Sequence, residues 1–101
     1  MKNIILNEAF DLLKETGIAT NESEFSKDWL GHSECYLRTL RFKETEPSVG
    51  SIAILASRLQ KAGNEMLSNR RYRQIGHNFI AMSKKCHEQV NEESVEFELA
   101  D

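Results

Sequence analysis

The chain has 101 residues, the length of a single domain that can bury a hydrophobic core of its own. Its 40% hydrophobic and 29% charged residues exclude wholesale disorder, and no apolar run approaches the roughly 20 residues of a membrane span. The net charge of −3 hides an uneven distribution: residues 38–85 carry ten Lys and Arg against three Glu, between acidic blocks at 1–37 and 86–101. This distribution indicates an anionic partner for the basic block, or pairing of the blocks within the fold or across a dimer.

The first predicted element is an amphipathic helix over residues 3–16. A single proline and many Leu, Ala, Glu, Lys and Arg favour an all-α fold throughout. Apolar side chains recur here at helical spacing, Asn3 is a candidate N-cap, and Gly17 is placed to stop the helix.

Two short helices and a turn are predicted next, over residues 23–42. Ser23 is placed to cap the first of them, which Gly31 ends. Ser33 is placed to cap the second, which runs from Glu34 to Phe42. A short helix, a glycine turn and a second helix with basic residues form the outline of a helix-turn-helix unit.

A fourth helix begins after the polar loop that ends at Pro47, with Ser48 as its cap. It carries a wide apolar stripe at helical spacing. Gly63 stops this helix or lies within it, since one internal glycine costs only about 1 kcal/mol. The pattern leaves both alternatives open.

The last predicted helix spans residues 70–90, and the acidic residues 91–101 are predicted to form a flexible tail. The domain is therefore expected to occupy residues 1–90, as a compact unit of four or five helices with a long last helix. Apolar residues in that helix lie close to a heptad seam, which can pack on the domain's own core or form a homodimer interface. The candidate interface residues are Tyr72, Ile75, Phe79, Met82 and Cys86.

Residues 25–59 show an ordered series of features: a buried pair, a glycine turn, a Ser-capped helix, a basic exit and a Pro-Ser helix start. The residues that carry them are Leu30, Gly31, Ser33, Leu37, Leu40, Pro47, Ser48, Ile52, Leu55, Ala56 and Leu59. In this order the segment resembles the helix-turn-helix domains of the lambda-repressor-like class. The pieces FSKDWLGHSECYLRTLR and EPS are also similar to a small, uncharacterised bacterial protein family. That likeness implies the same compact helical fold but no established activity.

The segment departs from the lambda-repressor-like pattern at three places. With Gly31 as the turn glycine, Lys27 falls where that class prefers a small residue, whereas a shift by one residue places Ser26 there but disturbs the turn. His32 falls where an aliphatic residue is usual, and the exit loop 43–46 contains two acidic residues and no glycine.

The resemblance and the basic block predict a small bacterial or phage-type regulator of transcription that binds double-stranded DNA as a homodimer. Its third helix would lie in the major groove, where long donor side chains read bases. Arg38, Thr39 and Arg41 are expected to face the groove, Ser33 and Lys43 to contact phosphate, and Arg71 and Arg73 to assist.

The alternative is a non-enzymatic adaptor or inhibitor that keeps the helical fold and binds a protein partner without binding DNA. The acidic loop residues Glu44 and Glu46 favour this reading. The chain has no C-x-x-C pair, no H-x-x-x-H pair and no Gly-rich phosphate loop, so we expect no catalytic residues, metal site or cofactor. Two cysteines and no signal-like segment favour a location in the cytoplasm.

Overall fold

The computed structural model describes residues 2–100, with side chains up to residue 94, and it confirms the all-α prediction. No strand occurs in residues 2–100. The elements in chain order are α1 (Lys2–Glu15), α2 (Glu22–Glu24), the π-helix η1 (Phe25–Trp29), α3 (Tyr36–Lys43), α4 (Val49–Leu67), the 3-10 turn η2 (Arg70–Tyr72) and α5 (Arg73–Ala100).

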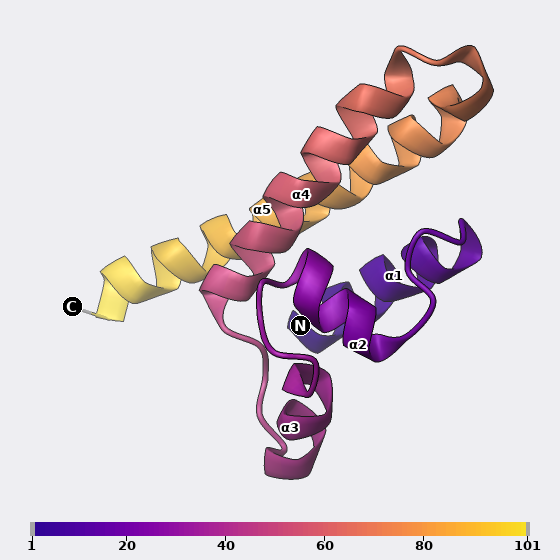
Figure 1. Ribbon diagram of the computed structural model, residues 1–101. Helices are drawn as coiled ribbons and strands as arrows, with labels where there is room; N and C mark the ends of the chain where they lie inside the picture. Colours follow the sequence, from indigo (N-terminus) through magenta and orange to yellow (C-terminus); the bar gives the residue numbers. More distant parts are fainter. Residues whose placement is uncertain (1, 101) are drawn as a thin grey trace.

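A long hairpin of α4 and α5 forms the frame of the molecule (Figure 1). Gly63 and Gly76 let the two helices approach closely: a Cβ on Gly63 would lie 2.9 Å from the carbonyl oxygen of Gly76, and a Cβ on Gly76 2.8 Å from that of Gly63. Further along, the buried Ser83 donates a hydrogen bond of 2.7 Å to the carbonyl of Ala56 in α4. Gly63 therefore lies within the continuous helix α4. The absence of a side chain there leaves the space that the close approach of α5 requires.

The N-terminal helices pack at the open end of this hairpin, where α5 also holds α1 (Figure 1). Lys2 of α1 pairs with Glu93 at 3.3 Å, and Lys85 pairs with Glu8 at the same distance. Trp29 of η1 meets Phe79 of α5 edge to face, with ring centroids 6.1 Å apart. One buried core thus joins residues from α1 through α5.

Several predicted helix ends are confirmed and others are wrong. Gly17 follows α1 with a φ of 74°, and Ser48 caps α4 by accepting from the amide of Ser51. α1 begins before Asn3, and Asn21 rather than Ser23 caps α2. The last α-helix does not end at residue 90: α5 continues to Ala100, so the boundary predicted between the domain and an acidic tail is not a helix boundary.

The predicted dimer seam on the last helix packs against the chain's own core. Phe79 and Cys86 are fully buried, Met82 is 6% exposed, and Ile75 is half-buried against the same cluster. Of the five candidate interface residues, only Tyr72, at the hairpin turn, is exposed. The heptad-like spacing therefore reports the packing of α5 on its neighbours, and these buried side chains are not free to contact a second copy.

None of the described helices combines the length and the apolar character that a membrane crossing would require.

Replacing Gly63 with Ala should lower the free energy of unfolding by about 1–3 kcal/mol, because the new methyl group would overpack the contact with α5. Gly50→Ala is the matched control, since its Cβ would meet only Ser48 Oγ at 3.9 Å. That substitution should leave stability unchanged or raise it by up to about 1 kcal/mol. Urea unfolding followed by circular dichroism measures both variants. Equal stability of the two would contradict the close approach of α4 and α5.

The two cysteines should differ sharply in reactivity. Burial, with a smaller contribution from Glu8, raises the pKa of the Cys86 thiol from 9.0 to about 12, whereas Cys35 is exposed. A thiol reagent at pH 8 should therefore modify Cys35 rapidly in the native protein, and Cys86 only after denaturation. Because its folded-state pKa is the higher one, the protonated Cys86 supports the fold below pH 9 and loses that contribution as the pH rises further.

Native Cys35→Ser protein is the control and should show no rapid modification. Rapid reaction of two thiols in the native wild type would show that Cys86 is not sealed in the core.

Candidate nucleic-acid interface

Ser26 is the small residue that lets α3 pack on the preceding helix. It is fully buried, and its Oγ lies 3.4 Å from the amide nitrogen of Leu37, which donates to it. The segment around it is π-helical, with the amide of Leu30 donating to the carbonyl of Phe25. A π-turn holds one residue more than an α-turn, so Ser26 faces α3 while Gly31 still reaches the turn with a φ of 68°. Ser26, and not the exposed Lys27, is thus the small buried residue that contacts α3.

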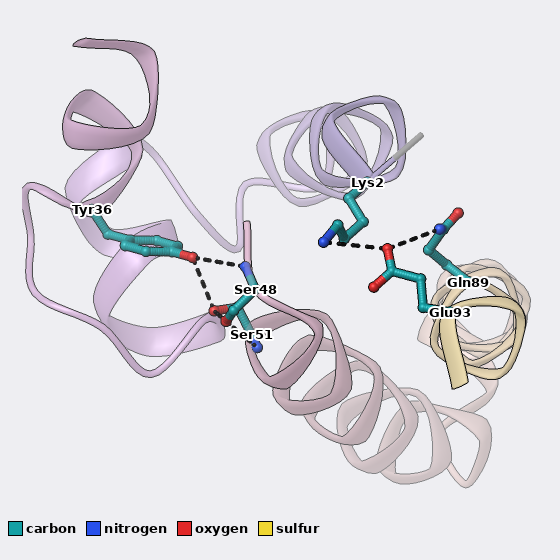
Figure 2. A network of polar contacts seen from close by, with 6 residues as sticks. All are labelled: Lys2, Tyr36, Ser48, Ser51, Gln89 and Glu93. Carbon is teal, nitrogen blue, oxygen red and sulfur yellow. Dashed lines mark hydrogen bonds and ion pairs between the residues drawn. The ribbon is translucent and has the colours of Figure 1, made fainter. Parts of the chain in front are cut away.

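A cluster of polar side chains ties the start of α3 to the start of α4 (Figure 2). Tyr36 Oη lies 3.1 Å from Ser51 Oγ and accepts from the amide of Ser48 at 3.3 Å. Ser51 Oγ also lies 2.8 Å from Ser48 Oγ and 2.6 Å from His32 Nε2. The His32 ring stacks on Tyr36 with centroids 3.6 Å apart. His32, which departs from the aliphatic pattern, thus belongs to this contact between the turn and α4.

Other contacts fix the ends of these short helices. Glu44 ends α3 in the left-handed conformation, with a φ of 53°. Arg58 of α4 donates to the carbonyls of Lys27 and Asp28, near the last turn of η1. Cations at a helix C-terminus stabilise the exposed carbonyls and the helix dipole. Arg58 therefore supports the fold, although it belongs to the basic block.

Four exposed residues at spacings of three and four form the outer stripe of α3 and its N-cap: Cys35, Arg38, Thr39 and Phe42. Leu37 and Leu40 face the other way, into or against the core. The outer stripe includes Arg38 and Thr39, two of the three residues predicted to face a groove. Lys43, predicted to contact phosphate, is also exposed at the end of α3.

The surroundings of Arg41 and the predicted Ser33 cap are both visible in this region, and the predicted cap is wrong. Arg41 pairs with both carboxylate oxygens of Glu22, so its guanidinium turns toward α2. Ser33 does not cap α3: the helix starts at Tyr36, and Cys35 at its N-cap makes no side-chain cap hydrogen bond. Six residues, 30–35, separate η1 from α3, more than the three or four of a standard helix-turn-helix.

Arg71 and Arg73 lie apart from α3. Arg71 lies in η2 and Arg73 begins α5, at the end of the hairpin remote from α3 in a molecule 47 Å long (Figure 1). The Arg71 guanidinium lies 5.7 Å from the ring centroid of Tyr72. The seven residues predicted for DNA binding therefore do not form one surface.

A groove of about 550 Å³ lies between α1 and α3. Apolar side chains contribute to its lining, among them Leu6, Phe10, Leu37 and Leu40. Polar residues complete it, including both partners of the Glu22–Arg41 ion pair. No group of three His, Cys, Asp or Glu that could hold a metal ion occurs among the described residues.

Sequence reasoning missed the residues that begin α2 and the serine that connects α3 to α4. Asn21 caps α2 by accepting from the amide of Glu24 at 2.9 Å, and the Glu24 carboxylate accepts from the amide of Thr20 at 2.9 Å. The N-x-x-E pattern at residues 21–24 is the signal that could have located this start. The contacts of Ser51 with His32 and Tyr36 had no such signal, because these residues come from the preceding turn and helix.

Ser51→Ala should lower the free energy of unfolding by about 1–3 kcal/mol, since it leaves the partners of a buried hydroxyl without their shared contact. Ser57→Ala is the matched control: this serine is exposed on the same helix, so its loss should change stability by less than about 0.5 kcal/mol. Thermal and urea unfolding measure both. A Ser51→Ala protein as stable as Ser57→Ala would show that the polar cluster does not hold α3 in place.

Comparison with known families identifies one model, described as a family of unknown function (DUF6626), which matches residues 6–99. The similarity to an uncharacterised family is thus confirmed, whereas the comparisons show no match to lambda-repressor-like domains. Searches of curated proteins and of solved structures found no significant match. Because the match covers nearly the whole chain, this protein belongs to the DUF6626 family of unknown function.

Proposed function

We propose that the protein is a small regulator that binds double-stranded DNA through the outer stripe of α3. The observation that carries the proposal is the burial of Ser26 against α3. This contact supports the helix-turn-helix interpretation, because a small buried residue lets α3 pack on the preceding helix. The opposite face of α3 is left exposed to solvent. The long turn at 30–35 makes the unit a variant of that arrangement.

The side chains of the outer stripe, and Lys43 at the end of α3, suit contacts with DNA. Arg38 and Lys43 are exposed, and neither makes a hydrogen bond or ion pair among the residues that the structure describes. A free guanidinium can bind guanine or phosphate, and an ammonium group can bind phosphate. Thr39 lies beside Arg38 on the same face and can donate to a base or a phosphate.

The charge of this surface is modest, which sets the expected affinity. Glu34 and Glu44 are exposed at its two ends and would repel the phosphate backbone. Since Arg38 and Lys43 are the two cations on α3 that are unpaired among the described residues, we expect one chain to bind DNA weakly. Its affinity should fall only gradually as the salt concentration rises. Arg71 and Arg73 are excluded from the proposed interface because they lie at the other end of the hairpin.

A second candidate function is a protein-binding adaptor, and the groove between α1 and α3 favours it. Its volume of about 550 Å³ and its apolar side chains would suit an apolar side chain of a protein partner. The Glu22–Arg41 pair at this groove would add polar contacts. DNA titration separates the two functions, because only the first of them requires that the protein bind a duplex.

The Arg38→Ala/Lys43→Ala variant should bind a fluorescently labelled random-sequence duplex several-fold more weakly than the wild type at low salt. The negative slope of log K against the logarithm of the salt concentration should become shallower by about 1–2, because each phosphate contact contributes about −0.9 to it. Fluorescence anisotropy at two or more salt concentrations measures both quantities.

The matched control is Arg71→Ala/Arg73→Ala, which removes the same charge from the remote end of the hairpin and should bind nearly as the wild type does. Equal weakening of both double variants would mean that net charge alone drives binding. No binding by the wild type even at low salt would refute the proposed function.

A further inference from the structure

Phe42 is the most exposed large hydrophobic residue in the part of the chain that the structure describes. It is 89% exposed, compared with 58% for Ile4, the next in order. It lies in the last turn of α3, where neither the core nor the groove between α1 and α3 includes it. The ring therefore contributes no buried area to the stability of the fold. An aromatic residue at this position suggests a contact outside the chain.

The location of Phe42 identifies the surface to which it belongs. It follows Arg38 by four residues and Thr39 by three, so all three side chains project from the same face of α3. The α-carbons of Arg38 and Phe42 are one turn apart, about 6 Å along the helix. Any DNA that reaches Arg38 and Thr39 from outside would also meet Phe42.

We propose that Phe42 is a specificity residue that contacts thymine 5-methyl groups in the major groove. This inference rests on the proposed function and names a part of the sequence that it would recognise. Thymine is the only DNA base that presents a methyl group in the major groove, and apolar side chains, Phe among them, contact that methyl. Arg38 and Lys43 would supply attraction to DNA on either side of the ring, and Phe42 would favour sites with thymine at one position.

The test begins with selection of duplexes from a random pool by the wild-type protein at low salt. The best selected duplex is then compared with the same duplex in which deoxyuridine replaces thymine, which removes only the methyl groups. Loss of one methyl contact should weaken wild-type binding about three- to tenfold. Phe42→Ala should bind the two duplexes equally, and its affinity should match that of the wild type for the deoxyuridine duplex.

Two controls accompany the comparison. Phe42→Ala should unfold at the same temperature as the wild type, because the side chain is exposed. Tyr72→Ala removes an exposed aromatic ring from the remote hairpin turn and should keep the full preference for thymine.

The results distinguish this inference from the function on which it rests. A duplex that binds the wild type but shows the same thymine preference with Phe42→Ala would overturn the role of Phe42 and leave DNA binding intact. Failure of the wild type to select any duplex would overturn both. Sedimentation of the wild type as a dimer and of Phe42→Ala as a monomer would overturn the inference differently, since Phe42 would then contact a second copy of the chain.

Discussion

The close packing of α4 against α5 is the contact on which the rest of the structure depends. The two helices supply half of the buried hydrophobic core, and they approach closely enough that neither Gly63 nor Gly76 has room for a methyl group. Their hairpin gives the N-terminal helices a surface on which to pack, through Trp29 against Phe79 and the two ion pairs between α1 and α5. Short helices such as α3 are marginal by themselves, so their position has to come from this frame.

Two small polar residues, Ser26 and Ser51, make contacts that fix the position of α3 relative to this frame. Ser26 seats α3 on η1, while Ser51 connects Tyr36 and His32 to the first turn of α4. In both cases a short, buried hydroxyl-bearing side chain makes the contact: Ser26 accepts from the amide of Leu37, and Ser51 lies within hydrogen-bond distance of Tyr36 and His32. An alanine would fit either buried position but would lose these hydrogen bonds. The face that α3 presents to solvent is thus a consequence of two buried serines.

The distribution of charge acquires a different meaning once the fold is known. The basic middle of the chain does not form one surface: Arg58 supports η1, Arg41 pairs with Glu22, and Arg71 and Arg73 lie at the hairpin turn. Arg38 remains in the outer stripe of α3 proposed for DNA, and Lys43 is exposed beside it at the end of the helix. The contiguous basic block in the sequence therefore overstates how many cations could act together on one partner.

Local signals in the sequence determined the fold class, the Ser48 cap, the stop at Gly17 and the apolar faces of the helices. Such signals act between residues a few positions apart, so they can be read without a partner. Tertiary structure alone decided that Ser26 faces α3 through a π-turn, that Arg41 turns to Glu22, and that the seam containing Phe79 and Cys86 packs inward. Each of these depends on a contact with a distant segment, and neither periodicity nor charge counts report which segment is near. The stripe of Arg38, Thr39 and Phe42 required both: helical spacing placed the three residues on one face, and the packing of α3 left that face in solvent.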